Sequence, residues 1–486
     1  MPESIREQQM VLQLGAMSNM VGTHYWNAQQ DYQEDAVRHD VSFIQNGPLL
    51  LSENFKGTVP PQESAEERGA PEDAVADLGL DVTVISQGSF PHRYTWLCKC
   101  LPVPRMHRNF QALYYNPRSL NTLPRHYFSS SMPFSSFTLG RDVLAEVRDD
   151  LLESNLRYFM EACDSLQSFT ILADVHDAFS GLAVDVVEYL RDELPKSSIL
   201  GFGIEAPVAL QSQKRDVDGS KINAALALHS LSQLCNVYAP ISAPGDLEEY
   251  EGSALLASLV ESITFPSRTT LSGSSCNLHE ITSLVNSTGK TSVASLAYHA
   301  GDLPSPPAAS TAHKVPVEIP WLWDVSMCSA SRSGPEWGSV SVYRRESAYK
   351  TEDFEDMLQG YFTTPPNCSR SVPLKTGFPV SGHYFPKQVL PEDGALLVRL
   401  ASRPEIGAGL VGRAASNVKS IAGGFRVGGG DGWSSSTKSS AGKQESCGVS
   451  SSQLLASYSG GNHGLGREDF ADISEALFEL AQAYEF

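Results

Sequence analysis

Two turns in this sequence carry residue types suited to binding an anion. Residues 15–22 follow the apolar run 10–14, and residues 174–181 follow the apolar run 169–173. In both turns a small, polar stretch precedes a helix-compatible segment, and the free N–H groups of a helix N-terminus favour a phosphate or a carboxylate. Glycine spacing of this kind occurs more often in ordinary strand-to-helix turns than in nucleotide sites, so both interpretations stay open.

The second turn also carries titratable groups, because His176 stands close to Asp174 and Asp177. Such a cluster has the residue types of acid–base chemistry, and carboxylates beside a bound phosphate can hold Mg²⁺. No serine or cysteine stands in a recognisable nucleophile elbow. We therefore favour a loop histidine that hydrogen-bonds to its neighbours, and we keep the two aspartates as weak metal candidates.

The elements that must position these turns form a βαβ unit. A strand over 169–173, a helix over 182–194 and a second strand over 199–204 follow one another with short connections. This order predicts a parallel sheet with a right-handed crossover, and hence an α/β fold. Ligands of such sheets lie beyond the carboxyl ends of the strands, where both turns are expected.

The composition is that of a large, acidic, globular protein. The chain has 486 residues, 41% of them hydrophobic, which is enough for two or three domains. Lys and Arg number 36 against 56 Asp and Glu, and the net charge of −20 argues against nucleic-acid binding. No stretch approaches the roughly 20 apolar residues of a membrane span, and the first residues lack a presequence pattern, so we expect a cytosolic chain. Eight scattered cysteines favour reduced thiols.

Longer segments resemble the Misato family of tubulin-related proteins. Residues 13–26 look like the first phosphate loop and helix of tubulin, and more closely like their Misato version. Residues 163–181 resemble the approach to the glycine-rich loop of tubulin, followed by the Misato form of that loop. Residues 223–231 look like the tubulin helix whose Asn contacts guanine, and residues 277–280 look like the start of a helix in its intermediate domain. The resemblance implies a tubulin-like fold with a parallel-sheet nucleotide-binding-type domain, a mixed α/β intermediate domain and C-terminal helices.

The resemblance also assigns a site for GTP or GDP with Mg²⁺. Its residues would be Gly15, Ser18, Asn19, Gly22, Ser180, Gly181 and Asn223, with Asp174 or Asp177 at the metal. Several positions depart from tubulin. Phe179 adds bulk and Asp177 adds negative charge to a loop that is mostly glycine in tubulin, while Ala16 and Gly252 replace polar residues. Nucleotide binding therefore stays open, and efficient hydrolysis is disfavoured.

Other candidates for chemistry are weaker. Glu280 falls where tubulin-like assemblies supply a hydrolytic carboxylate to the next subunit, but a solvated helix glutamate is favoured. Lys290 and Thr291 imitate the end of a P-loop, but Leu284 occupies the position of its first glycine. The residue types of a zinc site occur at His92, Cys98, Cys100 and His107. Two thiols on one face of a strand are more often ordinary half-buried side chains, so we do not favour a metal there.

Composition shifts along the chain suggest three regions. We expect a tubulin-like domain over 1–235, an intermediate domain over 236–400 and a C-terminal region over 401–486. An acidic insertion near 40–90 should contribute little core, and a Gly/Ser-rich stretch over 423–464 should be a flexible surface loop.

Two features of the last third involve apolar surface. A helix from Arg467 to Tyr484 has an apolar face that another element must cover. Tryptophans stand near prolines at Trp321, Trp323 and Trp337. They offer either a partner surface or core packing, and we favour core packing.

For function, the resemblance implies a non-enzymatic regulator of mitochondrial distribution, morphology and inheritance. We expect it in the cytoplasm and peripherally on the mitochondrial outer surface, as a monomer or small oligomer. The alternatives are a guanine-nucleotide switch or polymerising GTPase, and a factor linked to the cytosolic chaperonin that acts on tubulin and the spindle. Tubulin and the chaperonin are the protein partners that the resemblance suggests.

Overall fold

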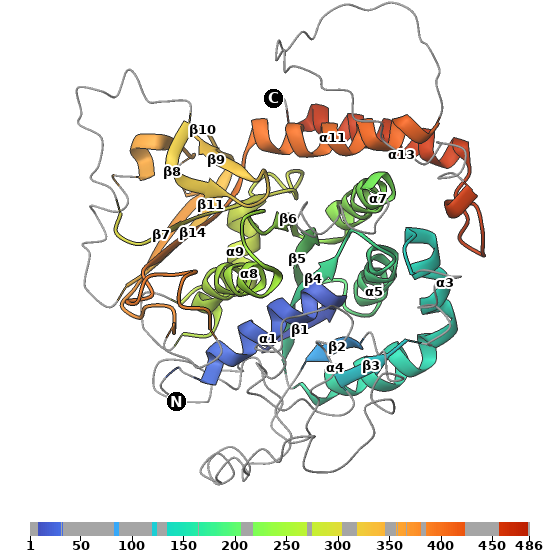
Figure 1. Cartoon of the computed structure of the whole chain (residues 1–486), viewed down its shortest axis with the longest axis horizontal. Helices are drawn as coiled ribbons and strands as arrows, with labels where there is room; N and C mark the ends of the chain where they lie inside the picture. Colours follow the sequence, from blue (N-terminus) through green and yellow to red (C-terminus); the bar gives the residue numbers. More distant parts are fainter. Residues whose placement is uncertain are drawn as a thin grey trace, which may run out of the picture.

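Two six-stranded sheets form the framework of the protein (Figure 1). The computed structural model describes residues 8–30, 32, 82–86, 119–123, 134–163, 165–205, 217–269, 275–303, 318–345, 356, 358–365, 367–380, 385–422 and 456–484. Within this part of the chain no helix has the length and apolar composition needed to cross a membrane. The zinc candidates Cys98, Cys100, His92 and His107 lie outside the described residues.

The first sheet has the strand order β3-β2-β1-β4-β5-β6. Its four parallel strands are β1 (Gln8–Leu14), β4 (Leu166–Asp174), β5 (Ser198–Glu205) and β6 (Val237–Ser242). Strands β4 and β5 are parallel and a helix connects them, which confirms the predicted βαβ unit. Apolar runs buried on both faces are typical of such parallel strands. Two antiparallel strands, β2 (Val82–Ser86) and β3 (Leu120–Thr122), extend the sheet beyond β1. Strand β2 lies within the insertion that we expected to contribute little core, and this short segment pairs with β1.

Helices cover both faces of the first sheet. On one face lie α1 (Ala16–Gln30) and α8 (Glu249–Thr264), which share a hydrophobic core with sheet residues such as Val11. On the other face lie α5 (Phe179–Glu193) and α7 (Val217–Leu234), which share a second core with residues such as Leu12. Successive strand residues point to opposite faces, so the two neighbours Val11 and Leu12 serve different cores.

A helical run precedes β4 on the α5 side. It consists of α3 (Phe137–Arg148), a π-helical segment (Asp149–Leu156) and α4 (Arg157–Ala162). Its apolar side chains, including Phe137, Leu144 and Phe159, belong to the same core as α5 and α7.

The second sheet has the order β13-β11-β14-β7-β8-β9. Its strands are β7 (Ser295–Ala300), β8 (Glu318–Asp324), β9 (Ser329–Arg332), β11 (Gly338–Arg344), β13 (Ser369–Leu374) and β14 (Leu396–Ser402). A short ladder of β10 (Gly334–Pro335) and β12 (Phe362–Thr363) forms a separate two-stranded sheet that packs against the second sheet through Phe362. Helix α8 and the shorter α9 (Leu278–Val285) join this sheet to the first one through a common core (Figure 1).

Two antiparallel helices complete the fold, α11 (Pro404–Ala422) and α13 (Arg467–Ala483). The apolar face of α13 packs with α11 in the core that also contains α7, which supplies the predicted cover. Tyr484, just after α13, is fully buried, and the absence of a side chain at Gly407 makes room for its ring.

The segment before α13 differs from the sequence-based expectation. Residues 456–464 belong to the stretch that we predicted to be a flexible surface loop, yet Tyr458 is 1% exposed and lies in the core. The rest of that stretch, 423–455, lies outside the described residues.

The three tryptophans near prolines differ from each other in their burial. Trp321 and Trp337 are half-buried, whereas Trp323 is 37% exposed, so core packing is the wrong assignment for Trp323.

Candidate functional site

The two predicted turns meet at one edge of the first sheet. Strands β1 and β4 are parallel neighbours in which Leu14 pairs with Ala173, so both chains leave the sheet at the same edge. Helix α1 starts directly after β1, and α5 starts a few residues after β4. The expected convergence of residues 15–22 with residues 174–181 is confirmed.

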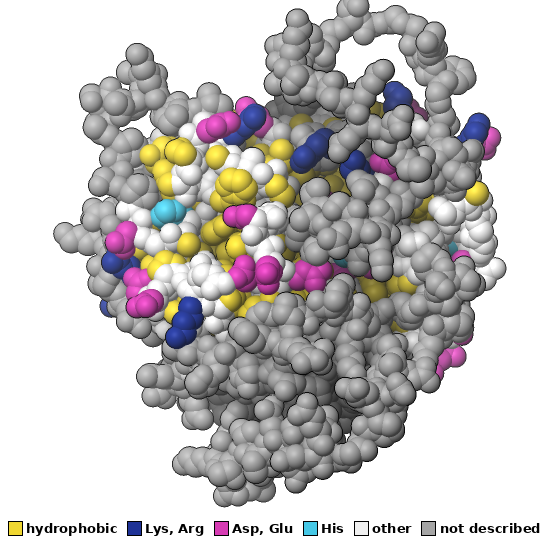
Figure 2. Space-filling view, viewed as in Figure 1, with side chains coloured by type: hydrophobic (Ala, Val, Ile, Leu, Met, Phe, Trp, Pro, Cys, Tyr) yellow, Lys and Arg dark blue, Asp and Glu magenta, His cyan; other side chains and the backbone are white. Residues whose placement is uncertain are grey.

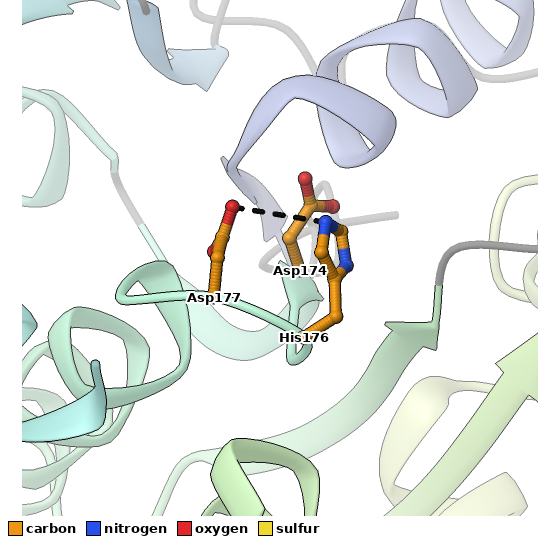
Figure 3. Close-up of side chains that lie close together, drawn as sticks. All are labelled: Asp174, His176 and Asp177. Atoms are coloured by element: carbon orange, nitrogen blue, oxygen red, sulfur yellow. Dashed lines mark ion pairs between the residues drawn. The ribbon is translucent and has the colours of Figure 1, made fainter. Parts of the chain in front are cut away.

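The carboxylate of Asp174 closes the N-terminus of α1. Its Oδ2 accepts a hydrogen bond from the backbone N–H of Met17 (2.9 Å), and its Oδ1 accepts one from the N–H of Ser18 (2.8 Å) and one from the Ser18 hydroxyl (2.7 Å). Asp174 and Ser18 are both 0% exposed. Figure 3 shows the carboxylate pointing from the end of β4 toward the first turn of α1. An N-cap side chain normally bonds these same two N–H groups, but here the cap comes from a neighbouring strand.

Glycine at position 15 permits this close contact. Its φ of +122° lies in the region that favours glycine, and a Cβ added there would lie 2.4 Å from Cγ of Asp174. Gly22 allows α1 to approach β1, since its added Cβ would lie 2.1 Å from the Gln13 side chain. The N–H of Asn19 donates to the carbonyl of Gly15 as part of the first helical turn. The polar first turn of α1 is therefore packed against Asp174.

Burial raises the pKa of Asp174 to about 6, with the neighbouring Asp177 also raising it. His176 and the hydrogen bonds from Ser18 and Met17 lower it, but they offset burial only in part. At neutral pH the carboxylate is therefore ionised, and its negative charge lies at the positive end of the α1 dipole.

Asp174, His176 and Asp177 also form a group with the residue types of a metal site. Their candidate ligand atoms lie within 4.8 Å of one another, and Nε2 of His176 lies 3.7 Å from Oδ2 of Asp177 (Figure 3). A Mg²⁺ ion shared with a phosphate would need the Asp174 oxygens to face that phosphate. They face the amides of α1 instead, so Asp174 does not fit this role.

In the second turn, residues 174–181, the start of α5 is also occupied by groups of the protein itself. The Ser180 hydroxyl donates to the backbone carbonyl of Asp177, and Ser180 is buried. The backbone at Gly181 lies against the start of α3, where an added Cβ would lie 1.9 Å from the carbonyl oxygen of Phe137. Helix α3 therefore covers the start of α5.

Asn223, the residue assigned to guanine, lies on α7, on the face of the sheet opposite α1 and α8. Its Oδ1 accepts from the N–H of Phe137 (3.0 Å) and from the hydroxyl of Tyr458 (2.7 Å). Its Nδ2 donates to the carbonyls of Ser135 (2.6 Å) and His176 (3.2 Å). A side-chain amide donates two hydrogen bonds and accepts two, so this one is saturated within the protein.

Glu280 lies at the opposite edge of the first sheet. It belongs to α9, where the ring of the adjacent His279 contacts the hydroxyl of Ser198 at the amino end of β5 (2.8 Å). Its carboxylate accepts from the N–H of Asn277 and pairs with Arg370 (3.3 Å). Within one chain this carboxylate cannot reach the edge that carries Asp174.

Two family models and several known proteins match parts of this chain. A family model described as the Misato Segment II tubulin-like domain matches residues 8–54, and a model described as a tubulin domain matches residues 102–269. Protein dml1 of Aspergillus niger is 30% identical over 305 residues, which cover 53% of this chain and 61% of that protein. Protein dml1 of Aspergillus clavatus is 29% identical over 303 residues, covering 53% of this chain and 60% of that protein. Protein misato homolog 1 of the mouse is 28% identical over 181 residues, covering 33% of this chain and 32% of that protein.

The chain is a tubulin-like relative of the Misato and Dml1 proteins. Both the predicted family relationship and the tubulin-like α/β fold class are confirmed. The matched region spans about 60% of the length of these Dml1 proteins.

The sequence did not identify two important contacts of this tubulin-like site. It offered Asp174 as a metal ligand and gave no role to Tyr458. A buried Asp at the end of an apolar strand requires a donor partner, and the neighbouring turn offers the N–H groups of a helix, so that signal was present. No local signal pointed to Tyr458, which lies 235 residues from Asn223 along the chain.

Proposed function

We propose that this protein regulates the distribution, morphology and inheritance of mitochondria through protein contacts, without binding or hydrolysing a guanine nucleotide. One observation carries the non-enzymatic part of the proposal: the N-terminus of α1 is closed by the carboxylate of Asp174. In a tubulin-like fold this helix end is where a phosphate group would bind. A phosphate there would compete with an internal anion that already makes three hydrogen bonds.

The saturated amide of Asn223 supports the same proposal. A guanine base would have to displace hydrogen bonds to α3 and to the segment before α13. The mitochondrial part rests on the relationship to the Misato and Dml1 proteins. We propose accordingly that the protein is found in the cytoplasm and on the outer surface of mitochondria.

The first test measures nucleotide in the purified protein. The protein is denatured after gel filtration, and the released guanine nucleotide is quantified by anion-exchange chromatography. We expect far less than one nucleotide per chain and no saturable binding of a fluorescent GTP analogue. Stoichiometric GDP or GTP would contradict the non-enzymatic proposal and favour the GTPase alternative.

The second test is made in cells of the organism that makes this protein. Short depletion should cause mitochondria to clump or fragment while the microtubule array stays normal, and re-expression should restore the network. Spindle defects with normal mitochondria would contradict the proposal. That result would favour the chaperonin-linked role in tubulin organisation.

A further inference from the structure

Trp323 is exposed on the second sheet. Among the described residues, Trp323 and Phe478 are the large hydrophobic side chains that remain most accessible, each 37% exposed. Trp323 of β8 pairs directly with Tyr298 of β7, and residues that face each other across antiparallel strands project from the same side of the sheet. The two aromatic side chains therefore form one surface feature. Exposed tryptophan of this kind is typical of protein contact sites.

An acidic turn lies beside Tyr298. Tyr298 packs against the same core as Leu247, which lies in the turn before α8. That turn and the first turn of α8 contain Asp246, Glu248, Glu249 and Glu251, and no Lys or Arg. Burial raises the pKa of Tyr298 and the negative charge of Asp246 raises it further, which places this carboxylate close to the tyrosine.

The space-filling view shows both parts on one face of the protein. In Figure 2 hydrophobic side chains gather over the region where Figure 1 draws β8, and acidic side chains lie across the region of α8. Three of the acids have partners within the protein: Glu248 and Glu251 form the capping box of α8, Glu251 also accepts from Gln388, and Glu249 makes an interaction of its own. Asp246 is exposed.

The chemistry of this surface selects a basic partner. Cations are attracted to the face of a tryptophan ring and to carboxylates, whereas an acidic segment would be repelled by this acidic turn. Strand β8 is paired with β7 and β9, so a partner cannot add a strand beside it and must bind through side chains. A basic amphipathic helix meets these conditions, because it offers apolar residues to the ring and Lys or Arg to the acids.

We propose that Trp323, Tyr298 and Asp246 form a docking surface for a basic amphipathic helix of a partner protein. This proposal rests on the proposed function, because it names the class of partner through which the protein would act.

The test uses a fluorescently labelled basic amphipathic peptide and a matched peptide in which every Lys and Arg is replaced by Glu. Binding to the full chain is followed by fluorescence anisotropy at low and at physiological salt. The basic peptide should bind saturably, more weakly at higher salt, and the acidic peptide should not bind. Trp323→Ala should weaken binding by about tenfold or more, the effect typical of a central aromatic contact.

The chain offers matched controls on α13. Phe478→Ala removes an equally exposed aromatic side chain and should change affinity by less than about twofold. The variant Asp246→Asn should weaken binding and reduce its salt dependence, while Glu468→Gln, which removes an exposed acid of α13, should leave both unchanged. Circular dichroism and thermal unfolding establish that each variant is folded.

Three results would overturn the proposal: equal binding of the two peptides, equal losses in the Trp323 and Phe478 variants, or no saturable binding. Mitochondrial rescue separates this proposal from the proposed function. If wild-type protein restores mitochondria but the peptide does not bind, the docking surface is wrong and the proposed function stands. If the peptide binds as expected but depletion leaves mitochondria normal, the proposed function is wrong and the docking surface stands.

Discussion

The Asp174 carboxylate lies 2.7 Å from the Ser18 hydroxyl, although 156 residues separate the two along the chain. The same carboxylate also accepts the N–H groups of Met17 and Ser18. These contacts tie the first helix of the protein to the end of β4. An anion supplied by the chain thus occupies the place that a bound phosphate would take at this helix end.

Asp174→Ala should uncover this anion site. The variant loses three hydrogen bonds and the anion at the N-terminus of α1, and we expect unfolding to require about 1–3 kcal/mol less free energy. The bare helix end should then bind a small anion, so sulfate should raise the melting temperature of the variant more than that of the wild type. Differential scanning fluorimetry with sodium sulfate, compared with sodium chloride at equal ionic strength, measures this difference.

Asp185→Ala is the matched control, because it removes another acid, partly buried, which pairs with Arg141 (2.6 Å) rather than with a helix N-terminus. It should lose stability without a specific response to sulfate. An equal sulfate response in the two variants would contradict the assignment of Asp174 as a substitute for phosphate.

The stability of the protein should depend on pH between about 4 and 6. Burial raises the pKa of Asp174 and that of Asp185 from 3.8 to about 6. Because each pKa is higher in the folded protein, the folded state binds more protons in this range, and the contribution of each group is lost as the pH rises. Each group should lower the free energy of unfolding by up to about 1.4 kcal/mol per pH unit within this range.

Urea unfolding at pH 4, 5, 6 and 7 measures this dependence. Replacing either acid by its amide removes one titrating group, so Asp174→Asn and Asp185→Asn should each flatten the profile, and the double variant should flatten it further. A profile that keeps its full slope in the double variant would show that other groups are responsible.

Glu261 should be required for stability. It is fully buried on α8, where its Oε1 lies 3.0 Å from Arg268 and its Oε2 contacts Arg344 of β11. Arg344 also donates to the hydroxyl of Tyr32 (2.7 Å). Glu261→Gln leaves two buried guanidinium groups without their counter-charge and should cost about 3–5 kcal/mol. Chemical denaturation measures this loss.

Glu280→Gln provides the comparison for an exposed ion pair. The Glu280 side chain is 49% exposed beside Arg370, so its loss should cost at most about 1 kcal/mol. If the two variants lost equal stability, the buried network would not carry the role that we assign to it.

The sequence predicted the elements whose signals are local. The apolar runs that became β1, β4 and β5 are buried on both faces, as is typical of parallel strands, and the strand–helix–strand order predicted the parallel sheet. Residues 277–280 were expected to begin a helix, and Asn277 caps α9 by accepting from the N–H of Glu280. The convergence of the two turns also followed from the pattern, because the carboxyl ends of parallel strands share one edge.

The contacts that close the site could not be predicted in the same way. The Asn223 side chain forms hydrogen bonds with α3, with the turn after β4 and with Tyr458. These partners lie far from Asn223 along the chain, so no periodic sequence pattern indicates the contacts. The prediction that Trp323 packs in the core was wrong for a different reason. Alternation along β8 assigns its side chain to one face of the sheet, but it does not say how far the helices on that face extend.

Tyr458→Phe should loosen the segment that precedes α13. The Tyr458 hydroxyl donates to Oδ1 of Asn223 (2.7 Å) and lies 3.0 Å from the carbonyl of Gly219, so its removal should cost about 1–2 kcal/mol. Hydrogen exchange measured by mass spectrometry should become faster in residues 456–466 and in the first turns of α7. Tyr484→Phe is the matched control, because its hydroxyl accepts from the N–H of Val293 and its effect should be confined to that contact and α13. Unchanged exchange in residues 456–466 of the Tyr458 variant would show that this hydroxyl does not hold the segment against α7.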